Sequence, residues 1–241
     1  MKVLVAGATG AIGRPLVSAL MAAGHEVMGM SSSENGARSL REKGAEGEVA
    51  NALDENAVLA LVRRVKPDAV IDELTSLPKR YTPEEMRAAA DRDRNVRLVG
   101  GHNVHNAARA AGARRYIAQS TGFFYGPGEG LATEKDALAV NASPGVAGSA
   151  RTYMQIEERV LGVRDLLGVA LRYGFFYGRE RITTRFTGAC PSRSANRRIQ
   201  CLARAAAYSR LYTLKTRRLR PWRRLKAILA FTTLWMTILQ R

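Results

Sequence analysis

The chain has 241 residues, enough for one α/β domain or for one domain with a small appendage. Hydrophobic residues make up 46% and charged residues 24%, which is ordinary for a globular protein and excludes a fibrous or largely disordered chain. The two cysteines, Cys190 and Cys201, exclude a disulfide framework. The apolar run at residues 3–6 is too short for a secretory signal, so we expect a cytoplasmic protein.

The net charge of +17 is concentrated at one end of the chain. Residues 1–180 hold 23 Lys and Arg against 21 Asp and Glu, a net charge of +2, whereas residues 181–241 hold 15 basic residues and no acidic one, +15. A strongly basic protein often binds nucleic acid or an anionic membrane. Here this interpretation applies only to the last quarter of the sequence.

Short β-rich apolar segments alternate with segments of helical spacing along most of the chain. The predicted strands cover residues 2–6, 25–30, 48–50, 69–71, 116–120 and 169–173. The predicted helices cover about residues 14–23, 35–43, 54–65, 83–94, 96–111 and 152–166. This alternation predicts an α/β fold with a doubly wound parallel sheet, which binds its ligand at the carboxyl ends of the strands.

A glycine turn, Gly7, Gly10 and Gly13, follows the first strand and opens the first helix. In a Rossmann unit, the first glycine allows the tight turn, the second lets the backbone approach a pyrophosphate, and the third lets helix and strand pack closely. The helix N-terminus then presents free N–H groups to the phosphates. A glycine-rich turn without a ligand is the alternative. The strand–turn–helix context favours dinucleotide binding.

The end of the second predicted strand bears on the choice between NAD and NADP. An acidic residue there would bind the ribose 2′-hydroxyl of NAD, but Ser31 and Ser32 stand there, with no acid before Glu34. Because serine hydroxyls can donate to a 2′-phosphate, the sequence leans toward NADP. The alternative is that these serines only cap the next helix.

Several motifs in order resemble the extended or atypical short-chain dehydrogenase/reductases, and within them the NAD-dependent epimerase/dehydratase family. The resemblance covers about residues 1–180. It rests on the glycine turn, on Asn-Ala-Leu-Asp at 51–54, on the strand at 69–71, on Ser-Thr-Gly-Phe-Phe-Tyr-Gly at 120–126, and on the segments at 103–117 and 171–178. We therefore expect a Rossmann domain over residues 1–180, with NAD or NADP as cofactor.

The resemblance also implies which residues contact the cofactor. They are Gly7, Thr9, Gly10, Ala11, Ile12, Gly13, Ser31, Ser32, Asn51, Ala52, Leu53, Leu74 and Thr75. The family usually has Asp where Asn51 stands. An asparagine carbonyl can still accept a hydrogen bond from the adenine amino group, so we expect this contact to be weaker than with Asp.

The catalytic residues implied by the resemblance are only partly present. The family uses a Tyr with a Lys four residues later, plus a Ser or Thr after the fifth strand, and Ser120 and Thr121 fill the last role. Tyr153 lies on the expected helix and is the candidate proton donor. Four residues later stands Glu157 rather than Lys, and a carboxylate near Tyr153 would raise the pKa of its hydroxyl.

A second alignment removes Tyr153 from the site. If Glu157 or Glu158 matches the usual acid of this helix, then Ser149 or Ala150 occupies the tyrosine position and Tyr153 is a packed or surface residue. Two hypotheses therefore stay open. One is an NAD(P)-dependent oxidoreductase or epimerase acting on a sugar-nucleotide-like or small carbonyl substrate. The other is a non-catalytic or truncated dinucleotide-binding protein.

The histidines give no indication of a metal site. His102 and His105 are three residues apart on a predicted helix, a spacing that metals can use, but no carboxylate or Cys completes a set. We expect no metal, and we expect these histidines to be solvated or to cap a helix.

The basic tail, residues 181–241, has three interpretations. It is a cationic segment that binds nucleic acid or anionic lipid, a folded substrate-binding lobe such as the family would have, or a segment foreign to the family that arose from a shifted reading frame or a fused terminus. The abrupt loss of acidic residues favours the third. Its apolar stretch at 225–239 is shorter than the roughly 20 residues that span a bilayer.

Overall fold

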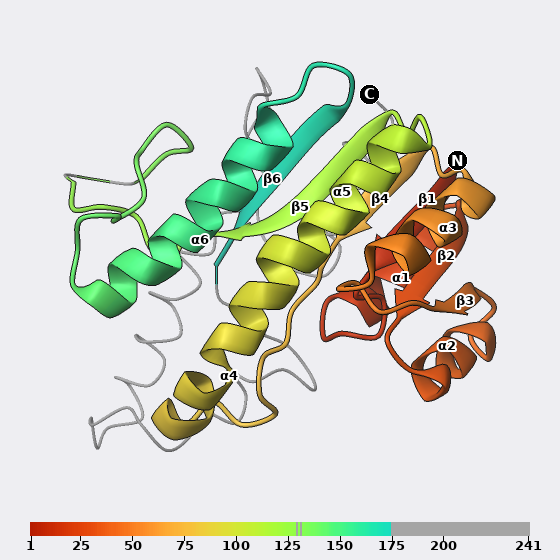
Figure 1. Ribbon diagram of the computed structural model, residues 1–241, viewed down its shortest axis with the longest axis horizontal. Coiled ribbons are helices and arrows are strands. Elements are labelled where there is room, and N and C mark those ends of the chain that lie inside the picture. The colour runs from red at the N-terminus through yellow and green to blue at the C-terminus, as the bar shows by residue number, and fades with distance from the viewer. Residues whose placement is uncertain (129, 131, 175–241) are drawn as a thin grey trace, which may run out of the picture.

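The computed structural model describes residues 1–128, 130 and 132–174, and these contain one parallel sheet with helices on both faces (Figure 1). The strands lie in the order β3-β2-β1-β4-β5-β6. They are β1 (Lys2–Ala6), β2 (Glu26–Ser31), β3 (Glu46–Val49), β4 (Ala69–Asp72), β5 (Arg115–Thr121) and β6 (Leu167–Tyr173). The helices are α1 (Gly13–Ala22), α2 (Glu34–Arg41), α3 (Glu55–Val65), α4 (Pro83–Asn95), the π-helix η1 (Val96–Gly100), α5 (Gly101–Ala110) and α6 (Pro144–Leu161). The predicted doubly wound fold is confirmed.

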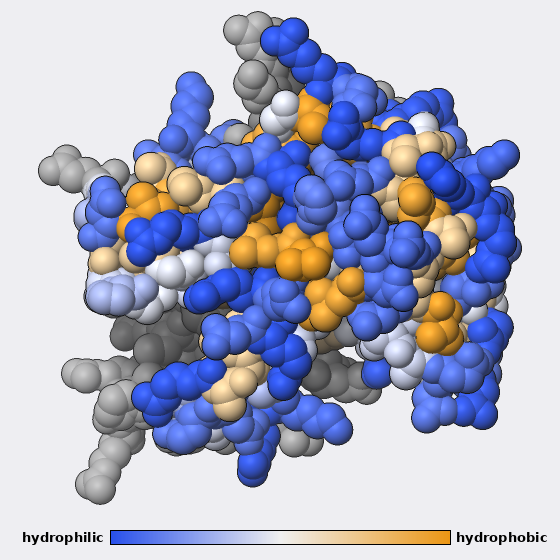
Figure 2. Space-filling view, in the orientation of Figure 1, coloured by the Kyte–Doolittle hydropathy of each residue, from blue (hydrophilic) through white to orange (hydrophobic). Residues whose placement is uncertain are grey.

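Two hydrophobic cores lie on opposite faces of the sheet. Helices α1 and α2 pack on the face that includes Val5 and Ile71, and α3, α5 and α6 pack on the face that includes Leu4 and Val70. Neighbouring residues of one strand therefore point to different cores, as the period of two in a strand requires. On the side formed by α5 and α6, hydrophilic side chains dominate the surface and apolar ones form small separate groups (Figure 2).

Capping side chains start three of the helices. Ser33, Asp54 and Thr82 each accept a hydrogen bond from the backbone N–H three residues later, at 3.0–3.2 Å, and so begin α2, α3 and α4. The predicted starts of these helices agree with the structure to within one residue. Such caps depend on local sequence alone, which is why the sequence predicted where these helices start.

Helix α6 and strand β3 differ from the prediction. Helix α6 begins at Pro144 rather than near residue 152, and it ends at Leu161. Gly145 and Gly148 have low helix propensity and favoured a loop, but Ser143 followed by Pro144 is a helix-start signal. Strand β3 begins at Glu46, two residues before the predicted strand.

The predicted basic tail, residues 181–241, lies outside the described residues. Among the helices that the structure does describe, none is long and apolar enough to cross a membrane.

The π-helix η1 joins α4 and α5 into one continuous element, where the sequence predicted two helices. Its wide turn frees backbone carbonyls, and Arg159 of α6 donates to them, at 3.0 Å to Leu98 O and 3.4 Å to Arg97 O. The carboxylate of Asp72 lies 3.9 Å from the Arg159 guanidinium and balances its charge. Gly101 leaves the necessary space, because a Cβ there would lie 2.6 Å from Arg159 Nη2.

Replacing Arg159 tests this buried clamp on η1. Arg159→Met leaves the buried Asp72 without a cation, so we expect the free energy of unfolding to fall by about 3 kcal/mol in urea titrations at pH 7. The matched control is Arg109, whose pair with Asp165 is exposed to solvent. Arg109→Met should cost less than about 1 kcal/mol. Equal losses for the two variants would contradict the clamp.

Candidate functional site

The glycine turn lies between β1 and α1 at the carboxyl edge of the sheet. Gly7 has a φ of +77°, and a Cβ on it would lie 2.5 Å from the backbone oxygen of Glu73, which follows β4. A Cβ on Gly13 would lie 2.2 Å from the backbone oxygen of Gly7. Only glycine fits at either position, so both have the geometric roles that the sequence assigned to them.

The N-terminus of α1 is free to receive a phosphate. Its N-cap residue, Ile12, makes no side-chain cap, and no acidic residue lies in the first turn. Gly10 and Ala11 are exposed beside it, and Thr9 is partly exposed. Free N–H groups and the positive end of the helix dipole favour an anion here, so the residues present fit the pyrophosphate of a dinucleotide.

The serines after β2 have separate roles in the structure. Ser31 is buried, and its Oγ accepts a hydrogen bond from the backbone N–H of Ser33 at 3.3 Å. Ser33 caps α2, and Ser32 is exposed. The cap therefore belongs to Ser33, which leaves Ser31 and Ser32 at the strand end as candidate contacts to the ribose.

The predicted adenine contacts form a short turn after β3. Asn51 Oδ1 accepts a hydrogen bond from the backbone N–H of Leu53 at 3.1 Å, and both residues are exposed. Ala52 is buried, and its carbonyl accepts from the side-chain amide of Asn103 at 2.9 Å. An amide oxygen has two lone pairs, so Asn51 keeps one for an adenine amino group.

The end of β4 holds two buried carboxyl groups that the sequence analysis did not single out, Asp72 and Glu73. Tyr173 donates its hydroxyl hydrogen to Glu73 Oε1 at 2.6 Å, and Glu73 Oε2 is buried without a hydrogen-bond partner. Burial is the main cause that raises the pKa of Glu73; the hydrogen bond from Tyr173 lowers it, the charge of Asp72 raises it and the charge of Arg97 lowers it. Together these effects raise the pKa of Glu73 to about 8. The signal for this pair was two consecutive acids closing an apolar strand. Leu74 follows directly, and its backbone N would lie 3.2 Å from a Cβ on Gly7. Thr75, the next residue, is exposed.

Ser120 and Thr121 lie at the carboxyl end of β5, and both are buried. Ser120 Oγ donates to Glu157 Oε1 of α6 at 2.6 Å. Glu157 also forms a two-bonded ion pair with Arg172 of β6, at 2.7 and 2.8 Å. Thr121 Oγ1 accepts from the backbone N–H of Phe123 at 3.2 Å. Ser120 and Thr121 therefore lie at the same strand end. The Ser120 hydroxyl makes the shorter hydrogen bond of the two, so it is held more firmly than the Thr121 hydroxyl.

Tyr153 lies on α6, half-buried, with the ring of Phe124 at a centroid distance of 6.0 Å. The guanidinium carbon of Arg97 lies 5.2 Å from the centre of the Tyr153 ring. Burial raises the pKa of the Tyr153 hydroxyl, the charge of Arg97 lowers it, and the charge of Asp93 raises it. The sequence predicted that the carboxylate of Glu157 would raise the pKa of Tyr153. The pKa is raised, but burial is the main cause. Glu157 forms an ion pair with Arg172 instead.

A model of the NAD dependent epimerase/dehydratase family matches residues 3–222 of the sequence. The chain belongs to this family. A 3-diazoavenalumate denitrifying reductase from a Streptomyces species is 41% identical over 185 residues, which are 74% of this chain and 57% of that protein. Members of the family are NAD-dependent, and the NAD-binding Rossmann class expected from the sequence is confirmed.

Two solved structures resemble the chain closely enough in sequence to bear on its cofactor. The UDP-glucose 4-epimerase of Thermus thermophilus, in complex with NAD, is 29% identical with a TM-score of 0.56, over 74% of this chain and 56% of that one. A short-chain dehydrogenase/reductase superfamily protein from Agrobacterium tumefaciens, with bound NAD, is 27% identical with a TM-score of 0.58, over 73% and 49%. Neither structure supports the lean toward NADP.

The chain spans about half the length of the proteins that it matches. The family match continues past residue 180, where the sequence predicted the Rossmann domain to end. The origin of residues 181–241 stays a prediction.

His102 and His105 both lie on α5. His102 is exposed, as expected, but His105 is buried, because its ring packs edge-on against Tyr116 at 4.8 Å. The expectation of a solvated or capping residue is therefore wrong for His105. Burial lowers its pKa to about 4. In the described part of the chain, no group of three or more His, Cys, Asp or Glu could hold a metal ion.

The pH dependence of stability tests the buried state of Glu73. Its pKa rises from 4.5 to about 8 on folding, so the folded protein binds this proton more tightly than the unfolded chain does. The stability that it contributes is complete below pH 4.5 and is lost as the pH rises through 8. Glu73→Gln keeps an acceptor for Tyr173 and removes the titration. In urea unfolding we expect the variant to gain roughly 2–4 kcal/mol over the parent protein at pH 8, and little at pH 5.

The control for this measurement is Glu42→Gln, at an exposed residue next to α2. It should leave the difference between pH 5 and pH 8 unchanged. If Glu73→Gln had the same effect at both pH values, the buried titration would be refuted.

Proposed function

We propose that this chain binds NAD and transfers a hydride between it and a small carbonyl or sugar-nucleotide-like substrate. The observation that carries this proposal is the glycine turn, where Gly7 and Gly13 admit no side chain and α1 opens without a cap. Such a turn holds a pyrophosphate at the carboxyl edge of the sheet. Thr121 ends β5 at that same edge, two strands away from β1.

The proposal assigns a role to each candidate residue of the chain. Bound NADH supplies the hydride. Tyr153 holds the proton at its phenol oxygen and donates it to the substrate oxygen. Thr121 orients that oxygen with its hydroxyl. Ser120 acts at one remove, because its hydroxyl already donates to Glu157 and so fixes the end of β5 against α6.

A charge placed on the glycine turn tests the cofactor site. Ala11 is exposed in this turn and already carries a Cβ, so Ala11→Glu should fold normally while its carboxylate repels a pyrophosphate. We expect the Kd for NADH, followed by its fluorescence, to rise at least about 30-fold, which corresponds to about 2 kcal/mol. Ala22→Glu adds the same charge at the exposed far end of α1 and is the matched control.

The same titration, repeated with NADPH, tests the choice of cofactor. We expect NADH to bind more tightly, because the two solved relatives hold NAD. Tighter binding of NADPH would support the preference for NADP that Ser31 and Ser32 indicated in the sequence. If neither dinucleotide bound, the proposed function would be wrong.

A second candidate function is reduction of a diazo group. The Streptomyces relative is named a denitrifying reductase of a diazo compound, and this chain has Glu157 where the family's catalytic lysine would follow Tyr153. A hydride added to the terminal nitrogen of an aryl diazonium gives a diazene, which loses N2 and leaves a C–H bond. The sum is aryl–N2⁺ plus hydride giving aryl–H plus N2, so the protein needs to donate no proton.

Tyr153→Phe separates the two candidates. With 4-nitrobenzaldehyde as the acceptor we expect kcat to fall about 100-fold or more, because the proton donor is lost. With 4-nitrobenzenediazonium we expect a change of less than about threefold. Reactions without protein correct for direct reduction by NADH. Binding of NADH without turnover of either acceptor would support the non-catalytic alternative, and loss of both activities would contradict the diazo candidate.

A further inference from the structure

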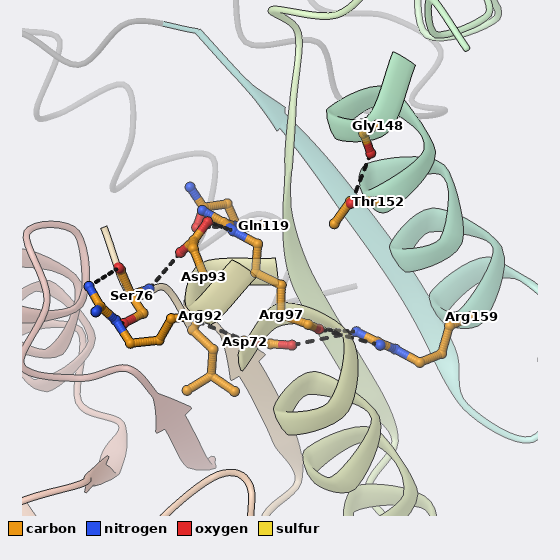
Figure 3. Close-up of polar contacts among 10 residues, drawn as sticks. Asp72, Ser76, Arg92, Asp93, Arg97, Gln119, Gly148, Thr152 and Arg159 are labelled. Carbon is orange, nitrogen blue, oxygen red and sulfur yellow. Dashed lines mark hydrogen bonds and ion pairs between the residues drawn. The ribbon is translucent and has the colours of Figure 1, made fainter. Parts of the chain in front are cut away.

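Arg97 of η1 is a buried cation beside the candidate proton donor. It is 5% exposed, and its guanidinium lies over the ring of Tyr153 at 5.2 Å. Its Nε donates to Asp93 Oδ2 at 2.7 Å, and its Nη1 lies 3.4 Å from Gln119 Oε1. Figure 3 shows Arg97 extending from the helix toward Asp93 and Gln119, with Asp72 and Arg159 below it. A buried arginine keeps its charge, so its field acts on the tyrosine in a weakly screening environment.

The backbone around Arg97 is held from two other elements. Arg159 of α6 donates to the carbonyls of Arg97 and Leu98, and Asp72 of β4 lies beside the Arg159 guanidinium (Figure 3). The π-helix and this clamp together set the direction of the Arg97 side chain. Asp93 is fixed in turn, because its Oδ1 accepts from the backbone N–H of Ser76 at 2.6 Å.

We propose that Arg97 supplies, from a neighbouring helix, the positive charge that the lysine four residues after the tyrosine would supply on α6. It is a positioning residue that acts through Tyr153. The inference rests on the proposed function, in which Tyr153 is the proton donor for a carbonyl substrate. This role explains how a chain with Glu157 at the lysine position still places a cation beside Tyr153.

The charges around Tyr153 agree in sign with this role. Arg97 lowers the pKa of the tyrosine hydroxyl, and Asp93 raises it by pairing with Arg97 and adding a negative charge. Further along α6, Glu157 forms an ion pair with Arg172 at 2.7 Å, and Arg159 lies 3.9 Å from Asp72. The opposite charges of each pair largely neutralise each other. Burial is the largest cause of the raised pKa of Tyr153, and among the charged groups Arg97 and Asp93 act on it in opposite directions.

Two substitutions should move the acidity of Tyr153 in opposite directions. Arg97→Met removes the cation and keeps much of the stem, so the pKa of Tyr153 should rise by about one unit. Asp93→Asn removes the negative charge and keeps an oxygen acceptor for Ser76, so the same pKa should fall. The full chain, labelled with ¹³C at the tyrosine ζ carbons, is titrated by NMR, and Tyr153→Phe assigns the signal.

Enzyme kinetics give a second measurement on the same variants. For reduction of 4-nitrobenzaldehyde, Arg97→Met should lower kcat/KM about three- to tenfold, while the Kd for NADH stays unchanged. In the pH profile of kcat/KM, the pKa of the alkaline limb should rise. Arg97→Lys should restore most of the rate. The control is Arg92→Met, because Arg92 is an exposed arginine of α4 that donates to Ser76.

The outcomes separate this inference from the proposed function. If Arg97→Met and Asp93→Asn moved the pKa of Tyr153 in the same direction, or left it unchanged, the inference would be overturned even where the enzyme is active. If no carbonyl substrate turned over but the two pKa shifts appeared with opposite signs, the placement of the charge would stand and the proposed function would fail. Should Arg97→Met not fold, the shift in Asp93→Asn decides alone.

Discussion

The close packing of the glycine turn against the end of β4 is the constraint on which the site depends. β1 and β4 are neighbours in the sheet, and the absence of a side chain at Gly7 lets the turn rest on the backbone of Glu73. Gly13 then brings α1 down onto the same turn. These contacts fix the N-terminus of α1, the candidate phosphate site, next to the end of β4. The candidate catalytic side chains could not share an edge with a dinucleotide if any larger residue separated these elements.

Helix α6 is linked to the rest of the fold through three polar side chains, of which Glu157 is buried and Tyr153 and Arg159 are partly buried. Tyr153 meets Arg97 of η1, Glu157 meets Ser120 of β5 and Arg172 of β6, and Arg159 meets the carbonyls of η1. A buried charge is costly unless it is paired, so these contacts fix the rotation and register of α6 more strictly than apolar packing would. The position of Tyr153 thus depends on its own contact with Arg97 and on the pairs that Glu157 and Arg159 form further along α6.

The sequence predicted those features of the fold that depend only on residues close together in the chain. The alternating strands, the glycine turn and three capped helix starts follow from neighbouring residues, and they were found. The length of α6 was underestimated because Gly145 and Gly148 outweighed the start signal at Ser143 and Pro144. The partner of Tyr153 could not be found in this way. Arg97 and Tyr153 lie on separate elements, η1 and α6, which meet only in the folded chain. The contact that holds Arg97 in place comes from Arg159, 62 residues later in the sequence, and it requires the wide turn of η1.

Moving the cation from α6 to η1 changes how the site depends on its surroundings. A lysine four residues after the tyrosine would be held on the same helix by the helix geometry alone. Arg97 instead reaches Tyr153 across an interface between helices, and the interface is closed by Arg159 and Asp72. Loosening η1 would therefore weaken the acid at Tyr153 without touching α6 or the glycine turn. In the proposed function, proton donation and dinucleotide binding thus depend on separate parts of this fold, and either could be lost while the other remains.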